Sequence, residues 1–236
     1  MTNPHYFKMT IALIFDVETT GLLPKNYTKD FPKNVCNLPR ILQISFILYD
    51  IEHRQLIETY NQYIWQDIKT IDPIITNLTG IDMNLMNKRG IPMEHALEAL
   101  LKAFCKSTCV VAHNLDFDSR MIMIECERYK DHLSESTYSL LPALFDATFV
   151  LDYGISLECT MMMTVNFCNL ERENARGTYK KLPKLVELYQ ILFDKIPENL
   201  HNSMVDVFAC LRCYLKYKYN MDLEEEVFQK MIDSHL

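Results

Sequence analysis

The sequence predicts an α/β protein in which a mixed β-sheet is covered by helices on both faces. Strand-like segments come first, two of them arranged as a hairpin, and helix-like and strand-like segments then alternate before the chain ends in helices. The hairpin favours antiparallel pairing and the alternation favours parallel pairing, so the sheet is expected to be mixed. Hydrophobic residues make up 49% of the chain and charged residues 23%, which is typical of a globular protein with a substantial core.

Three strands are expected near the start of the chain. Residues 11–17 form a short apolar run that ends in a Thr-Thr-Gly turn, which indicates a buried strand. Residues 41–51 and 55–64 have the composition of two further strands, and the polar residues 50–53 between them fit a hairpin turn.

The middle of the chain is expected to alternate helices with one strand. A brief helix is predicted over residues 73–79, because Gly80 follows it directly. Residues 92–105 carry apolar side chains at helical spacing, which predicts an amphipathic helix lying on the sheet. A β-branched strand is expected over residues 108–113 and a helix over residues 117–129.

The later segments are mainly helical in this interpretation. Residues 134–157 have the least distinct pattern, and a strand is predicted within them at residues 144–150. Helices are expected over residues 160–168, 183–193, about 203–217, and in the acidic tail.

We expect one domain, residues 1–236, with a core over about 11–218 and an acidic C-terminal helix over 219–236. Only five glycines occur, and no Gly/Ser-rich or Pro-rich linker interrupts the chain. No membrane span or signal peptide is evident, so an intracellular protein, cytoplasmic or nuclear, is expected. The eight cysteines are irregularly spaced and several lie in apolar runs, which favours reduced core thiols over disulfides or a zinc site.

The net charge of −7 taken alone argues against a nucleic-acid-binding protein, but the charges are unevenly distributed. Residues 222–236 are strongly acidic, whereas residues 22–40 and 172–184 are basic. Either basic stretch can be a solvated loop or a phosphate-binding surface, and the sequence leaves both readings open. Lys180 and Lys181 in the second stretch are candidate substrate contacts.

Two carboxylates close the first predicted strand. Residues two apart in a strand point to the same face, so Asp16 and Glu18 are expected side by side at its C-terminal end. Two neighbouring negative charges are costly unless a cation lies between them. A metal site is therefore favoured over a pair of acids that merely cap the following turn.

The segment AHNLDFD supplies a third acidic position. Asp116 and Asp118 are both possible helix N-caps, and we assign Asp116 to the loop or cap and Asp118 to the metal. Asn114 either holds the turn or contacts the substrate.

The fourth acidic position interrupts an apolar run. Asp206 lies among Met204, Val205, Val207 and Phe208, where a carboxylate needs a cation or several donors. His201 lies five residues earlier and can converge with Asp206 only if it precedes the helix.

These residue types fit phosphodiester hydrolysis assisted by two metal ions. Carboxylates of Asp16, Glu18, Asp118 and Asp206 would hold two Mg²⁺ or Mn²⁺ ions about 3.5–4 Å apart. His201 would remove a proton from the attacking water as general base.

The segments FDVETTG, AHNLDFD and HNSMVD resemble the three motifs of the DEDDh 3′–5′ exonucleases, a DnaQ-like family that includes proofreading subunits of bacterial replicative polymerases. The resemblance covers residues 11–218 and implies an RNase H-like fold with a five-stranded mixed sheet. In the family pattern the acid after Phe is the ligand, which favours Asp118. The resemblance also implies that the turn residues contact the terminal nucleotide: Thr19, Thr20, Gly21 and, as a wedge against the base, Leu22.

The resemblance leaves the substrate and the partners open. Compared with the family pattern, residues 23–39 are longer and more basic, and residues 131–157 are extended. Single-stranded DNA 3′ ends are the preferred substrate, with RNA trimming as the alternative. A non-catalytic binding module is the least favoured reading. An accessory subunit could dock on a polymerase through the apolar residues of the tail, Val227, Phe228, Met231 and Ile232.

Overall fold

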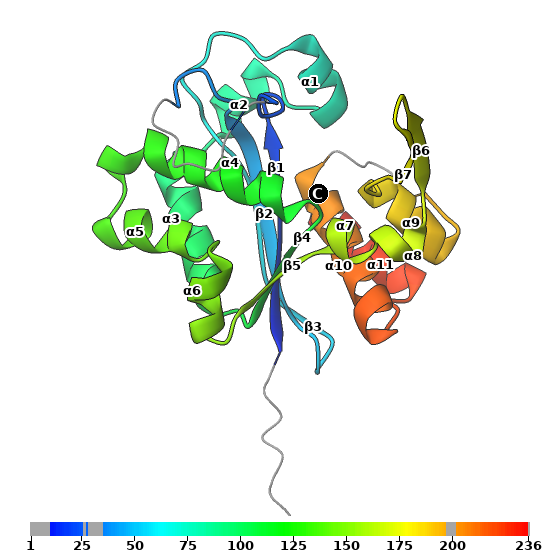
Figure 1. Cartoon of the computed structure of the whole chain (residues 1–236). Helices are drawn as coiled ribbons and strands as arrows, with labels where there is room; N and C mark the ends of the chain where they lie inside the picture. Colours follow the sequence, from blue (N-terminus) through cyan, green and yellow to red (C-terminus); the bar gives the residue numbers. More distant parts are fainter. Residues whose placement is uncertain (1–9, 26, 28–34, 197–201, 236) are drawn as a thin grey trace, which may run out of the picture.

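A five-stranded sheet forms the centre of the computed structural model, which describes residues 10–25, 27, 35–196 and 202–235. The strand order is β3-β2-β1-β4-β5 (Figure 1). The strands are β1 (Ile11–Thr19), β2 (Ile41–Asp50), β3 (Gln55–Tyr63), β4 (Cys109–Ala112) and β5 (Ser156–Cys159). The predicted mixed sheet is confirmed, because β1 pairs antiparallel with β2 and parallel with β4.

The central strand β1 is longer than its parallel neighbour. Its pairing with β4 ends at Ile14 opposite Val111, while its pairing with β2 continues to Thr19. Among the residues that the structure describes, no strand therefore covers one edge of the C-terminal half of β1. Backbone groups and side chains on this edge are available to a helix or a ligand, as expected at the carboxyl end of a sheet in an α/β protein.

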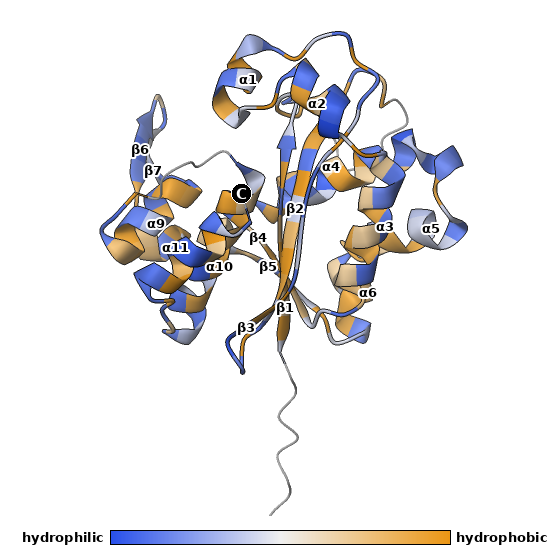
Figure 2. Ribbon diagram, turned by 180° about the vertical axis from the view of Figure 1, so that it is seen from behind, coloured by the Kyte–Doolittle hydropathy of each residue, from blue (hydrophilic) through white to orange (hydrophobic). Residues whose placement is uncertain are grey.

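Helices cover both faces of the sheet, as Figures 1 and 2 show from opposite sides. One face carries α3 (Met93–Phe104), α4 (Leu115–Arg128), α5 (Glu135–Ala143) and α6 (Ala147–Asp152). The other carries α7 (Thr160–Met163), α8 (Val165–Cys168), α9 (Leu185–Phe193), α10 (Ser203–Tyr219) and α11 (Glu225–Asp233). The short helices α1 (Pro73–Thr79) and α2 (Met83–Arg89) lie beyond the end of the sheet. None of the helices in the described ranges combines the length and apolar character that a bilayer span needs.

Alternating residues of β1 enter the two cores on opposite faces of the sheet. Ala12 and Ile14 pack in the core that contains α10, while Leu13 and Phe15 pack in the core that contains α3 and α4. Because side chains alternate along a strand, Asp16 and Glu18 continue the Ala12–Ile14 face, toward α10. The fold thus sets the direction of both carboxylates.

The segment over residues 134–157 differs from the prediction. Residues 144–150, expected as a strand, form the turn that follows α5 and the first residues of α6. Asp146 N-caps α6 by accepting hydrogen bonds from the backbone N–H groups of Thr148 and Phe149. This local capping outweighs the β-propensity of the apolar residues that follow, since an N-cap satisfies donors that a strand would have to pair elsewhere.

Three other local elements differ from the prediction. Helix α2 was not predicted, although Asp82 caps it through the N–H of Leu85. The helix expected over residues 160–168 is divided at Thr164 into α7 and α8. A small second sheet, β6 (Glu171–Asn174) with β7 (Gly177–Lys180), stands in the basic stretch that was read only as a loop or phosphate surface.

The acidic tail is helical as predicted, but its apolar face packs on the protein itself. Phe228 and Ile232 of α11 are buried in the core beside α10, and Met231 packs against the same core. The guanidinium of Arg212 stacks on the ring of Phe228 and pairs with Glu225 at 2.9 Å. The predicted docking of a polymerase on this apolar face is therefore wrong, because the face packs against the protein's own core. Of the four apolar tail residues proposed for docking, only Val227 is exposed.

All eight cysteines are free thiols, as the irregular spacing of the cysteines favoured. Cys210 and Cys213 are buried in α10 and belong to no metal-ligating group among the described residues. Cys105 lies in one of the apolar runs that predicted core thiols, but it is exposed, because it follows the last residue of α3 at the helix C-cap.

Candidate active site

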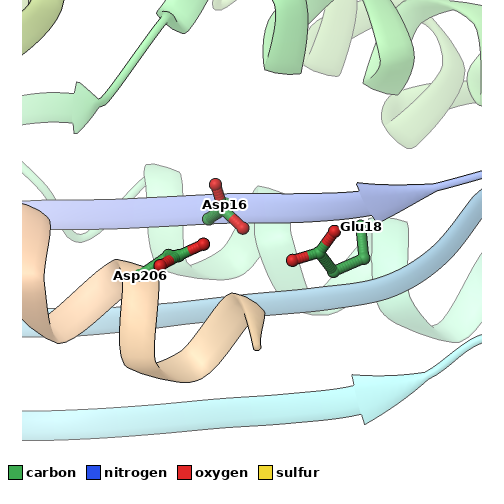
Figure 3. A group of neighbouring side chains, drawn as sticks. All are labelled: Asp16, Glu18 and Asp206. Atoms are coloured by element: carbon green, nitrogen blue, oxygen red, sulfur yellow. The ribbon is translucent and has the colours of Figure 1, made fainter. Parts of the chain in front are cut away.

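Three carboxylates converge at the C-terminal end of β1. One oxygen from each of Asp16, Glu18 and Asp206 can be chosen so that all three lie within 4.8 Å of one another. Figure 3 shows Asp16 and Glu18 reaching from the strand toward Asp206 on the neighbouring helix. Three oxygens at this separation match the donor set of a hard divalent cation such as Mg²⁺ or Mn²⁺.

The first turn of α10 brings Asp206 to the strand. The hydroxyl of Ser203 donates a 2.9 Å hydrogen bond to the backbone oxygen of Asp16 and so fixes the start of the helix against β1. Asn202 caps the same helix by accepting from the N–H of Met204 at 3.1 Å. A carboxylate in the first turn is favoured by the positive end of the helix dipole.

Asp118 lies beside the three clustered carboxylates but is not within their 4.8 Å group. It is 2% exposed, and its Oδ1 accepts a 3.3 Å hydrogen bond from the backbone N–H of Val17. This N–H lies on the part of β1 that extends beyond β4, so Asp118 takes the place of a missing strand partner. The charge of Asp118 also raises the pKa of Glu18, which places the fourth acid within electrostatic range of the cluster.

Asp116 and Asn114 occupy different positions from those considered. Helix α4 begins at Leu115, so Asp116 lies in its first turn rather than in the preceding loop or at the cap. Its side chain is 62% exposed and pairs with Arg120 at 2.9 Å. Asn114 is the N-cap residue with φ of 79°, a left-handed conformation that asparagine tolerates well. This backbone position supports the turn role for Asn114.

Burial and mutual repulsion raise the pKa values of the clustered carboxyl groups. Desolvation raises the pKa of Asp16 to about 7, against a hydrogen bond from Ser203 that lowers it. Desolvation is also the largest cause for Glu18, and the charges of Asp16, Asp206 and Asp118 contribute further to a pKa of about 10. Desolvation followed by the charge of Asp16 raises the pKa of Asp118. Bound cations would favour the ionised form of these carboxyl groups.

The turn after β1 is ordered by its own polar groups. The hydroxyl of Thr19 donates to the Gly21 carbonyl at 2.7 Å, and the Thr20 hydroxyl accepts from the N–H of Arg40 at 2.9 Å. Leu22 is 84% exposed. A large apolar side chain held out on an ordered turn fits the predicted wedge against a base, which stays a prediction.

The remaining predicted residues have the following positions. Lys181 forms an ion pair with Glu187, and the Lys180 amine donates to the side chain of Asn166 at 2.7 Å. Their predicted substrate contacts therefore compete with contacts inside the protein. His201 lies outside the described residues, as do Lys29 and Lys33 of the first basic stretch.

Two residues that position the site were not singled out in the sequence. Ser203 ties α10 to β1, and a serine just before an apolar helix was the signal available. His113, at the end of β4, lies between the Thr160 hydroxyl at 2.9 Å and the Pro183 carbonyl at 3.0 Å. Its burial lowers its pKa to about 4, so the ring is neutral at physiological pH and serves as a structural link.

We predict that the metal-free protein loses thermal stability as the pH rises from about 4 to 7. The loss is expected to continue above pH 7, because Glu18 has the higher pKa. The unfolded carboxyl groups titrate near pH 4, whereas the folded Asp16 titrates at about 7 and Glu18 at about 10. Deprotonation in this window is thus more costly in the folded state, and stability is greatest below it. Saturating Mg²⁺ or Mn²⁺ is expected to raise the Tm more at pH 8 than at pH 5.5, measured by thermal unfolding against EDTA. An equal shift at both pH values would contradict the prediction.

The fold and this acidic site define a metal-dependent nuclease class. A family model described as exonuclease, of the RNase T type, matches residues 13–214, and the chain belongs to this family. A curated relative is the DNA polymerase III subunit epsilon of Treponema pallidum (strain Nichols), 26% identical over 168 residues, which are 69% of this chain and 70% of that protein.

Solved structures share the fold at low sequence identity. Exonuclease I of E. coli in complex with a dT13 oligonucleotide has a TM-score of 0.59 and 18% identity over 89% of this chain. The chain corresponds to only 42% of exonuclease I. The nuclease domain of 3′hExo, a DEDDh family member bound to rAMP, has a TM-score of 0.57 and 14% identity, covering 91% of this chain and 94% of that one. The RNase H-like exonuclease fold implied by the three motifs is confirmed.

Proposed function

We propose that this chain is a 3′–5′ exonuclease that hydrolyses single-stranded DNA from its 3′ end and releases nucleoside monophosphates. The observation that carries the proposal is the convergence of Asp16, Glu18 and Asp206 within 4.8 Å, with Asp118 beside them. Membership of the exonuclease family gives the class of reaction. The helices that cover both faces of the five-stranded sheet support a single catalytic domain.

The carboxylates of Asp16, Glu18, Asp118 and Asp206 would hold two divalent cations. When bound, such ions supply positive charge that activates water and stabilises the departing 3′ oxygen. The exposed Leu22 and the ordered Thr19–Gly21 turn would orient the terminal nucleotide beside them. His201 would take the proton of the attacking water, since a neutral imidazole is a suitable base near pH 7.

Replacing His201 by alanine is expected to lower kcat about a hundredfold or more while leaving metal affinity close to that of the wild type. A general base acts on the proton, whereas a ligand acts on the ion. The two roles are separated by measuring kcat together with the metal-induced increase in Tm. A large loss of the Tm increase would identify His201 as a ligand and overturn the assignment.

The substrate is tested by product analysis on matched DNA and RNA oligonucleotides, single- and double-stranded and blocked at either end. We expect mononucleotide release from unblocked 3′ ends of single-stranded DNA in Mg²⁺ or Mn²⁺. RNA trimming is the second candidate, favoured by the likeness to a nuclease domain whose structure contains rAMP. A wild-type protein inert on both nucleic acids would remove the enzyme proposal.

A polymerase partner is a further part of the proposal. It is supported by the relative named as a polymerase III subunit epsilon. Because the apolar face of α11 is buried, such a partner would bind elsewhere. We also propose that the protein acts on nucleic acid inside the cell, in keeping with its eight free thiols.

A further inference from the structure

The β6–β7 hairpin projects from the body of the protein at the active-site end. Figure 1 shows it standing beside α9, at the same end of the molecule as the tip of β1 and the start of α10. All eight residues of the two strands are exposed. Figure 2 shows the hairpin as predominantly hydrophilic. A two-stranded ribbon of this kind buries too little surface to contribute to the core.

The base of the hairpin is nevertheless fixed to neighbouring segments of the protein. The backbone N–H of Lys181 donates to the Leu170 carbonyl at 2.8 Å, and Lys180 reaches Asn166 of α8. Beyond β7, the carbonyl of Pro183 lies 3.0 Å from the Nε2 of His113, the residue that follows β4 in the turn that leads to Asp118. The segment that follows the hairpin is therefore held beside the turn that leads to Asp118, while the strands of the hairpin itself are exposed.

The two faces of the hairpin carry different charges. In an antiparallel pair, residues directly opposite each other share a face. Arg172 lies opposite Tyr179, so one face presents a guanidinium beside an aromatic ring. The other face carries Glu171 opposite Lys180, and Glu173 opposite Thr178. The first face has no acidic residue, while the second has two.

The two arginines of the hairpin are available to a ligand. Among the residues that the structure describes, none forms an ion pair with Arg172 or with Arg176, which lies in the turn. Tyr179 is 45% exposed. Exposed guanidinium groups together with an exposed ring provide phosphate contacts and a stacking surface, the two features that bind single-stranded nucleic acid without sequence preference.

We propose that the β6–β7 hairpin is an arm that holds the substrate strand on the 5′ side of the scissile bond. Arg172 and Arg176 contact its phosphates, and Tyr179 stacks on a base. The proposal rests on the proposed exonuclease function, because it assumes a strand whose 3′ end lies at the carboxylate cluster. In this proposal the substrate contacts of the basic stretch are made by Arg172, Arg176 and Tyr179. Lys180 and Lys181, which were predicted from the sequence to contact the substrate, secure the base of the hairpin instead.

The test compares a long and a minimal substrate. The double variant Arg172→Gln/Arg176→Gln is expected to bind a fluorescent dT strand of about fifteen nucleotides roughly tenfold more weakly. The slope of log Kd against log salt concentration is expected to fall by about 1.4, because two phosphate contacts are lost. Tyr179→Ala is expected to weaken binding about fivefold or more. Binding is measured in the Asp206→Asn background to prevent degradation. Hydrolysis of a dinucleotide, measured with Asp206 intact, is expected to be unchanged, because a dinucleotide does not reach the arm.

The matched control is Glu173→Gln/Thr178→Ala, on the opposite face of the same hairpin. This control is expected to bind the long strand as well as the unmodified hairpin does. Unchanged binding of the arginine variant, or an equal loss of binding in the control, would overturn the proposed role of the arm. In either case, normal dinucleotide hydrolysis would leave the exonuclease proposal intact. A loss restricted to duplex substrates would also overturn it, because the arm would then hold the complementary strand. A wild type that releases nucleotides from neither the dinucleotide nor the long strand would overturn the exonuclease proposal, and with it the placement of the arm on the 5′ side of a scissile bond.

Discussion

Replacing Asp206 by asparagine is expected to reduce metal-dependent nucleotide release from a 5′-labelled single strand by about a thousandfold or more. Asp206 contributes one of three carboxylate oxygens within 4.8 Å, so the change removes a charge from the site that would hold the cations. Asp16→Asn is expected to have a similar effect, because Asp16 contributes another of the three oxygens. The measurement is kcat/KM at saturating Mg²⁺ and again at saturating Mn²⁺.

The control for this prediction is Asp152→Asn, which removes an exposed carboxylate at the end of α6, outside the acidic cluster. It is expected to retain wild-type activity. The metal-induced increase in Tm should also be lost in Asp206→Asn but kept in Asp152→Asn, provided that both variants fold. Activity within about tenfold of the wild type in Asp206→Asn would refute the role of this cluster in catalysis.

Replacing Asp118 by asparagine is the second prediction with a large effect, and Asp116 provides its matched control on the same helix. Asp118 is 2% exposed and faces β1, whereas Asp116 is 62% exposed and paired with Arg120. We expect Asp118→Asn to lower kcat/KM about a hundredfold or more and Asp116→Asn to change it less than about threefold, since a surface ion pair contributes little.

The asparagine in place of Asp118 keeps an oxygen that can accept the hydrogen bond from Val17, so the fold should be retained. The Tm of the metal-free Asp118→Asn protein is expected to equal or exceed that of the wild type at pH 8, because the raised pKa of Asp118 marks its charge as unfavourable there. Thermal unfolding in EDTA measures this. If Asp116→Asn were the severe variant, the choice between the two acids would be wrong.

Much of the fold could be predicted from short-range patterns. The first three strands and helices α1, α3, α4, α9 and α10 follow from apolar periodicity and from stop signals such as Gly80, which has φ of 74°. Periodicity failed where capping decided the outcome, as at Asp146 of α6, and where no core was involved, as in the exposed β6–β7 hairpin. An exposed ribbon leaves no hydrophobic pattern to detect.

The sequence by itself determined which chemistry this protein carries. Asp16 and Glu18 are two residues apart on a strand, so strand geometry alone places them on one face. The acid at position 206 could be recognised because it interrupts an apolar helix, where a charge is costly without a cation. Three ordered motifs were sufficient for the family, which the match over residues 13–214 confirms.

Only the tertiary structure decided how these residues meet. Asp206 joins Asp16 because Ser203 bonds the start of α10 to β1, across 187 positions of the chain. The assignment of Asp118 came from the sequence, but its contact with the N–H of Val17 depends on which side of α4 faces β1. The availability of the arginines in the hairpin likewise depends on which neighbours lie within reach. Such relations depend on distances between segments remote in sequence, and local propensities carry no information about those distances.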